Sequence, residues 1–156
     1  MDSKAFQDLI PRNGCFGCGP DNVLGLRLKS RWDGEASVAR FAPQPHHAAG
    51  PAGFLNGGII ATLIDCHCVG TAIAWAYRLE GRPIGSAPEI WCVTAELQVR
   101  YRRPTPIRPA VDLRAWLEQQ AGRKFILGCA LSVAGEVCAE GRVVALRVAD
   151  DWRGDS

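Results

Sequence analysis

Asp65 is the residue of this chain whose type and surroundings best suit acid–base chemistry. On a helix, the residues that share its face are Ala61, Thr62, Cys68, Val69 and Ala72. None of these side chains is cationic, and only Thr62 could donate a hydrogen bond. Partial burial on such a face disfavours the charged form of a carboxylate and raises its pKa. Asp65 is therefore a candidate general base or nucleophile; the alternative is an Asp that faces solvent or accepts backbone hydrogen bonds.

The tripeptide Asn56-Gly57-Gly58 directly precedes the segment that carries Asp65. Asn is a favoured helix N-cap, and glycines allow a ligand to approach the free N–H groups of a first helical turn. A backbone donor at Gly57 could polarise a carbonyl and stabilise a developing oxyanion. Taken alone, the same tripeptide also fits an ordinary junction between a loop and a helix.

The spacing of Gly57 and Asp65 favours a site shared by two chains. The two residues are eight positions apart, which on one straight helix corresponds to about 12 Å along the axis. An Asp side chain cannot reach across that distance to a carbonyl bound at Gly57. If both groups act on one carbonyl, they must come from two helices lying side by side. We therefore expect a homodimer with the site at its interface.

These residues require a helix to position them, and the sequence predicts one central helix over residues 57–78. Apolar residues recur there at helical spacing and the flanking face is also apolar or small, which is typical of a helix buried in the centre of a fold. Alternation of apolar and polar residues predicts strands on both sides of it. These strands cover residues 24–29 and 36–41, joined through a hairpin signal at Asp33-Gly34, and then 93–102, 111–118, 124–133 and 137–148. We predict an α+β fold, with an antiparallel sheet of five to six strands around one long helix.

Composition indicates a single globular domain over residues 1–156, with a turn-rich N-terminal segment over residues 1–24. The chain has 156 residues, of which 47% are hydrophobic and 22% charged, and its net charge is +2. A charge this small does not suggest a nucleic-acid-binding protein, which usually carries a basic stripe. The longest apolar stretch contains Asp65, and a carboxylate in its middle is costly in lipid. We expect neither a nucleic-acid nor a membrane partner.

Seven cysteines are present, and their odd number argues against a framework of disulfides. Residues 1–10 hold three charged residues and no apolar leader, so a reducing cytoplasm is the expected location. Cys15 and Cys18 have the spacing of zinc ligands, but a zinc site needs further ligands and the adjacent His46 and His47 are poorly spaced to supply them. We expect a tight turn at Cys15–Cys18 without metal, and no cofactor.

Three other residues of the helix are expected to be structural. His67 lies two positions from Asp65, about 200° around the helix, so the two cannot form a dyad within one chain. We interpret it as a buried structural histidine. Cys66 and Cys68 are expected to be small core residues.

Three ordered segments carry a resemblance to a known family. They are Phe54-Leu55-Asn56-Gly57-Gly58-Ile59-Ile60-Ala61-Thr62-Leu63-Ile64-Asp65, then Val93-Thr94-Ala95-Glu96-Leu97-Gln98-Val99-Arg100-Tyr101-Arg102-Arg103-Pro104, and Cys15-Phe16-Gly17-Cys18-Gly19 with Asn22 and Gly25-Leu26. Together they resemble PaaI-like hotdog-fold acyl-CoA thioesterases over nearly the whole chain. The resemblance implies a hotdog fold, in which the sheet wraps the central helix and two subunits join their sheets. It also implies a homodimer or a tetramer built as a dimer of dimers.

The resemblance implies a role for each matched residue. The carboxylate of Asp65 would act as nucleophile or general base toward an acyl-CoA thioester. The N–H of Gly57, from the facing subunit, would bind the thioester oxygen, with Gly58 beside it. The hydroxyl of Thr94 would orient water or substrate. Apart from the resemblance, four arginines could meet the phosphates of CoA, although a solvated strand face explains them equally well: Arg100, Arg102, Arg103 and Arg108.

Asn56 stands where this family usually has His. Asn can cap the helix and donate a hydrogen bond, but it does not titrate near neutral pH as His does. If the histidine of the family only orients groups, activity survives. If it moves protons, this chain would hydrolyse acyl-CoA slowly or merely bind it. A dehydratase of the same fold is disfavoured, because it would need a histidine at this position.

Overall fold

The computed structural model describes residues 4–153. The first three residues of the expected turn-rich segment, and the last three of the expected domain, lie outside the described residues, so the single domain over residues 1–156 stays a prediction. The elements in chain order are α1 (Phe6–Leu9), β1 (Ser30–Asp33), β2 (Ala36–Phe41), a 3-10 turn (Pro45–His47), α2 (Gly57–Leu79), β3 (Cys92–Tyr101), β4 (Val111–Ala121), β5 (Lys124–Val133) and β6 (Glu136–Arg147).

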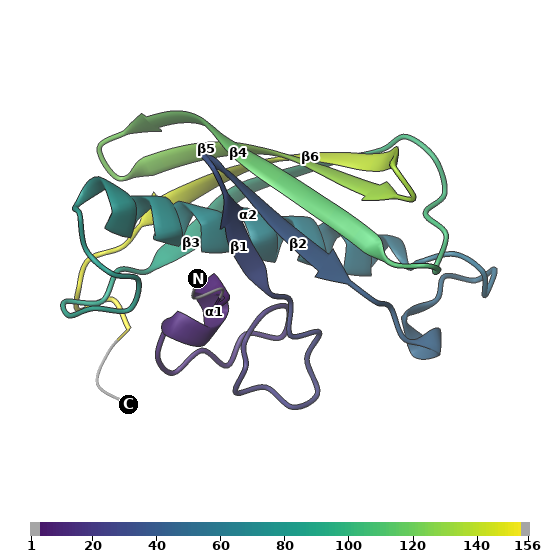
Figure 1. Cartoon of the computed structure of the whole chain (residues 1–156), viewed down its shortest axis with the longest axis horizontal. Coiled ribbons are helices and arrows are strands. Elements are labelled where there is room, and N and C mark those ends of the chain that lie inside the picture. The colour runs from purple at the N-terminus through teal and green to yellow at the C-terminus, as the bar shows by residue number, and fades with distance from the viewer. Residues whose placement is uncertain (1–3, 154–156) are drawn as a thin grey trace.

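The strands form one antiparallel sheet that curves around α2. Its order is β1-β2-β4-β5-β6-β3, so β3 forms an edge although it follows α2 directly in the chain. Figure 1 shows α2 lying along the sheet, with α1 and the N-terminal loop on the opposite side of the helix from β4, β5 and β6. The predicted α+β hotdog fold, an antiparallel sheet of five to six strands around one long helix, is confirmed, and the sheet has six strands.

The central helix closely matches its predicted range. Asn56 caps its first turn, and its apolar residues pack beneath the sheet in one core cluster with residues such as Leu113, Leu127 and Val143. By length and composition α2 could cross a membrane, but 67% of its most apolar window is buried inside the protein. Burial under a sheet accounts for a helix that is apolar on all sides.

The strand predicted over residues 24–29 is wrong, because the first strand begins only at Ser30. Arg27 has a positive φ of 56°, which interrupts an extended backbone. The N–H groups of Leu26 and Leu28 donate to the carbonyls of Phe16 and Gly17 instead of to a neighbouring strand. Leu26 and Leu28 are buried while Leu24 is 88% exposed. Two of the three alternating leucines thus pack in the core without belonging to the sheet.

A buried polar network joins α1, β1, β2 and α2. His67 is fully buried, as expected of a structural histidine. Its Nε2 lies 3.2 Å from the carbonyl oxygen of Ser37, which can only accept, so Nε2 carries the proton. Nδ1 therefore accepts from the Ser30 hydroxyl at 2.8 Å, and Ser30 in turn accepts from the Gln7 amide at 2.9 Å. The network satisfies polar groups that would otherwise be costly to bury.

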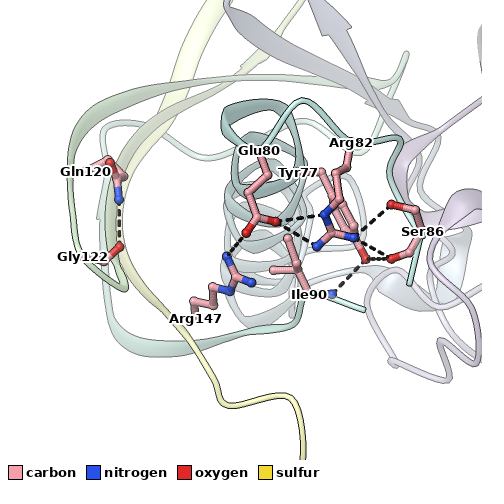
Figure 2. A network of polar contacts seen from close by, with 8 residues as sticks. All are labelled: Tyr77, Glu80, Arg82, Ser86, Ile90, Gln120, Gly122 and Arg147. Atoms are coloured by element: carbon pink, nitrogen blue, oxygen red, sulfur yellow. Dashed lines mark hydrogen bonds and ion pairs between the residues drawn. The ribbon is translucent and has the colours of Figure 1, made fainter. Parts of the chain in front are cut away.

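The loop after α2 is fixed by polar contacts that Figure 2 shows in detail. The Tyr77 hydroxyl accepts the N–H of Ile90 at 2.9 Å, and the guanidinium of Arg82 donates to the carbonyl of Ser86 at 3.0 Å. Glu80 pairs with Arg82 at 2.8 Å and with Arg147 of β6 at 3.2 Å. These contacts hold the chain where it turns back into β3, the strand that meets Asp65.

Candidate active site

Asp65 lies in the middle of α2 and meets the start of β3. The hydroxyl of Thr94 donates to Asp65 Oδ1 at 2.7 Å. Thr62, the one donor on the helix face of Asp65, bonds the Gly58 carbonyl at 3.0 Å, so the donor to Asp65 comes from β3 and not from the helix. Thr94 and Asp65, far apart in the sequence, are thus brought into direct contact.

The surroundings of Asp65 make its carboxylate a stronger base. Desolvation by the protein raises its pKa, the hydrogen bond from Thr94 opposes that rise, and the nearby thiol group of Cys15 adds to it. The net effect is a raised pKa, in the direction that the apolar sequence context predicts.

A cavity of about 240 Å³ opens beside this carboxylate. Its wall is mainly apolar, with Ile10, Val69, Ile73 and Trp91 among the residues that line it together with Thr94. Such a cavity can hold an apolar group against a reactive carboxylate. Trp91 lines this cavity, whereas Trp116 does not and is 40% exposed.

The N-terminus of α2 leaves one backbone donor open. Asn56 Oδ1 accepts the N–H groups of Gly58 at 2.8 Å and Ile59 at 3.1 Å. Among residues 4–153, none accepts a hydrogen bond from the N–H of Gly57. Asn56 therefore acts as the predicted cap. It engages Gly58, which was expected to bind substrate, and leaves the donor of Gly57 available to a ligand.

Tyr101, a residue that the sequence did not single out, orients this helix start. Its hydroxyl donates to the carbonyl oxygen of Gly57 at 2.7 Å. Its ring lies 3.6 Å from where a Cβ on Gly57 would stand, so one face of the glycine is covered. The available sequence signal is an aromatic residue at the end of an exposed strand, which is weak without the position of its partner.

Within one chain, Gly57 and Asp65 line different cavities. The cavity at Gly57 has a volume of about 540 Å³ and is also lined by Tyr101, Arg102 and Arg103. Asp65 is absent from it, and Gly57 is absent from the cavity of Asp65. The separation agrees with the helical spacing of about 12 Å, so one chain does not bring the two groups to one carbonyl.

The two arginines predicted to bind substrate lie at the rim of the cavity at Gly57. Arg102 pairs with Glu140 at 2.8 Å, and Arg103 pairs with Glu136 at 2.9 Å. All four side chains are about half exposed or more, where ion pairs contribute little to stability. A phosphate group could therefore compete with either carboxylate for its arginine.

The remaining candidates lie beside the cavity of Asp65. The Sγ atoms of Cys15, Cys18 and Cys66 lie within 4.8 Å of one another, and all three residues line that cavity. Cys66 is buried, in keeping with its expected place in the core. Its contact with the Cys15–Cys18 turn was not predicted, because it joins the N-terminal loop to a helix residue about fifty positions further along the chain.

Comparison with known proteins places this architecture in a family. Residues 52–139 match the family model of the thioesterase superfamily. A solved thioesterase superfamily protein from Shewanella loihica is 39% identical, with a TM-score of 0.64 over 78% of this chain and 91% of that one. A thioesterase structure from Haemophilus influenzae shares the fold, with a TM-score of 0.65 over 83% of this chain and 84% of that one at 14% identity.

Two curated relatives are acyl-coenzyme A thioesterases. THEM4 of Xenopus laevis is 36% identical over 92 residues, and THEM4 of Mus musculus is 30% identical over 90 residues. These matches cover 59% and 58% of this chain but only 35% and 33% of the relatives, so the chain spans about a third of their length. The matching family model covers more than half of the chain and includes the helix that bears Asp65. The chain therefore belongs to the thioesterase superfamily.

Proposed function

We propose that this protein hydrolyses acyl-CoA thioesters at sites formed between two copies of the chain. Each site would combine Asp65 and Thr94 of one subunit with the Gly57 N–H of the partner subunit. The observation that carries the proposal is the contact between Thr94 and the half-buried Asp65 beside an apolar cavity. The acyl-CoA thioesterase relatives favour acyl-CoA as the class of substrate.

The edge strand β3 supports a dimer of the required kind. It pairs with β6 on one side only, and most of its side chains are exposed, including Leu97 and Tyr101. A ten-residue strand with a free edge is a ready template for pairing with another chain. Antiparallel pairing of two β3 strands would set the two α2 helices side by side. The start of one helix could then approach the middle of the other, as a shared site requires.

The chemistry follows from the three groups. The partner's Gly57 N–H would donate to the thioester oxygen and stabilise the oxyanion that forms as the carbonyl is attacked. Asp65, as a carboxylate, would take a proton from the attacking water, which Thr94 helps to position. Collapse of the adduct breaks the carbon–sulfur bond, and the CoA thiolate leaves and is protonated. One water is consumed, and one carboxylic acid and one CoA thiol are released.

Asn56 is compatible with this scheme. Its side-chain oxygen accepts hydrogen bonds from the N–H groups of Gly58 and Ile59. The N–H of Gly57 is therefore the donor that stays open to a ligand. The proton transfers are assigned to Asp65, so no titrating side chain is needed at position 56. A protein that binds acyl-CoA without hydrolysis is the competing outcome of the experiment below.

The test is a hydrolysis screen across a panel of acyl-CoA esters that vary in chain length and aromatic character, with free CoA thiol as the readout. The wild-type protein is expected to turn over at least one class. Asp65→Asn keeps an oxygen that can accept from Thr94 but removes the base, and we expect turnover to fall by about 10²–10⁴-fold. Asp112→Asn is the matched control, because Asp112 is an exposed carboxylate of β4 paired with Arg40.

Two results would overturn the proposal. One is wild-type turnover in the Asp65→Asn variant. The other is tight binding of acyl-CoA without release of thiol from any ester, which would establish a binding protein in place of an enzyme.

A further inference from the structure

Three cysteines meet at one point beside the N-terminal loop. Cys15 Sγ and Cys66 Sγ are 3.6 Å apart, and Cys18 Sγ completes a group in which all separations are within 4.8 Å. Thiolates bound tetrahedrally to zinc at about 2.3 Å lie roughly 3.8 Å from one another. The three sulfur atoms are therefore close to the spacing of a zinc site, and farther apart than the roughly 2 Å of a disulfide.

The sequence around Cys15 builds this approach. The N–H of Gly19 donates to the Cys15 carbonyl at 2.8 Å, which closes the turn that bears both cysteines. A side chain at Gly17 would collide with Cys66 Sγ and approach Thr62 Cγ2 within 2.8 Å. Only glycine at this position lets the turn rest directly on α2. Because Gly17 has no side chain, the turn can contact Cys66 directly.

The cluster is open on one side. Cys15 is exposed, Cys18 is half-buried and Cys66 is buried, and all three line the cavity of Asp65. Among the described residues, no other His, Cys, Asp or Glu side chain joins the group. Three protein ligands and one free position facing a cavity form a complete tetrahedral set once a water molecule is added.

We infer that Cys15, Cys18 and Cys66 form a binding site for a thiophilic divalent cation, with Zn²⁺ as the expected ion and water as the fourth ligand. Binding would displace the thiol protons to solvent and leave three thiolates on the metal. The ion would fasten the N-terminal turn to α2 and so fix one wall of the cavity of Asp65. The sequence alone favoured a metal-free turn because only two ligands could be found; Cys66 supplies the third. This inference does not depend on the proposed hydrolysis.

The experiment measures metal directly on the full chain. Protein purified in a reducing buffer is analysed for zinc, and metal-free protein is titrated with Co²⁺. We expect one zinc per chain, and with Co²⁺ both the thiolate-to-cobalt charge-transfer absorption and the intense visible bands of a tetrahedral site. Cys15→Ser and Cys18→Ser should lose the zinc and both spectral features while keeping the far-ultraviolet circular dichroism of the wild type.

Cys92→Ser is the matched control, because Cys92 lines the same cavity but is not a member of the cluster. This variant should retain one zinc per chain. Wild-type protein that neither contains zinc nor takes up Co²⁺ under reducing conditions would overturn the inference. Metal that remains bound in both the Cys15→Ser and Cys18→Ser variants would overturn it as well, because the ion would then lie elsewhere.

Discussion

Thr94 and Asp65 are joined by a hydrogen bond of 2.7 Å that links the edge strand β3 to the central helix. At the far end of the same strand, Tyr101 bonds the carbonyl of Gly57 at the start of that helix. The edge strand β3 therefore contacts α2 at Asp65 and at Gly57, the two residues to which we assign the central chemistry. Any partner that pairs with β3 would be positioned relative to both groups at once.

Replacing Thr94 by Val should shift the pH dependence of hydrolysis. The hydrogen bond from Thr94 lowers the pKa of Asp65 against the larger effect of desolvation, so its loss raises that pKa further. Asp65 must be ionised to act as a base, and activity therefore disappears as pH falls through its pKa. We expect the acidic limb of the kcat/KM profile of Thr94→Val to move to higher pH.

The same substitution should also lower the rate at its plateau, by about 10- to 100-fold, if a hydrogen bond to a charged group contributes about 1.5–3 kcal/mol. Thr94→Ser, which keeps the hydroxyl, should retain the wild-type profile. An unchanged acidic limb in Thr94→Val would mean that Asp65 does not govern the pH dependence.

Gly57 offers a substitution that removes only a backbone donor. Proline is well tolerated at the first helical position, and Asn56 before it has the extended φ and ψ of −60° and 134° that a following proline requires. Gly57→Pro should therefore fold but lose about 10²–10³-fold in kcat, as expected when one oxyanion donor is removed. Gly57→Ala keeps the N–H, and its Cβ would meet only the Tyr101 ring at 3.6–3.8 Å. It should stay within a few-fold of wild type, and equal losses in the two variants would contradict a role for the N–H.

Mixing two inactive variants tests whether the site is shared. In a dimer of Asp65→Asn with Gly57→Pro, one of the two sites would combine an intact Asp65 with an intact Gly57 of the partner subunit. Random exchange of subunits in a two-fold dimer should restore about a quarter of the wild-type activity. Co-expression of the two variants with separate affinity tags isolates the mixed dimer. No recovery of activity in that purified dimer would refute the shared site.

Local pattern was sufficient to predict most of this fold. The helical spacing of the apolar residues predicted the end of α2 to within one residue. The strands after α2 were also predicted, because apolar and polar residues alternate over many positions in each of them. The error at residues 24–29 arose because Leu26 and Leu28 are buried under a loop, and burial alone produces the same alternation as a strand. The positive φ of Arg27 and the backbone hydrogen bonds to Phe16 and Gly17 distinguish the two cases, and the sequence reveals neither.

The candidate site was predictable where its residues share one segment and unpredictable where it depends on tertiary contacts. Asn56, Gly57 and Asp65 lie on one helix and its cap, so spacing and residue type identified them. The role of Thr94 was expected only from the resemblance to a family, and its hydrogen bond to Asp65 was not predicted. Cys66 was assigned to the core, since nothing in its neighbourhood reveals that the Cys15–Cys18 turn, far away in the chain, packs against it.

His67 should make the protein less stable in mild acid. Burial lowers the pKa of this histidine from 6.5 to about 4 in the folded protein, although its hydrogen bond to the Ser37 carbonyl opposes the shift. As pH falls below 6.5, the unfolded chain takes up a proton that the folded protein does not accept. The free energy of unfolding should therefore decrease between about pH 6.5 and pH 4, by roughly 3 kcal/mol in total, and level off below that range.

Urea denaturation at a series of pH values measures this dependence, and His67→Gln is the variant that isolates it. The variant should be less stable than wild type at pH 7, because it disrupts the hydrogen bonds to Ser30 and Ser37. Its stability should fall less steeply between pH 6.5 and pH 4, since the titrating group is gone while the carboxylates, Asp65 included, are unchanged. Parallel curves for the two proteins across this range would show that His67 is protonated alike in the folded and unfolded states, contrary to its burial in a network that holds it neutral.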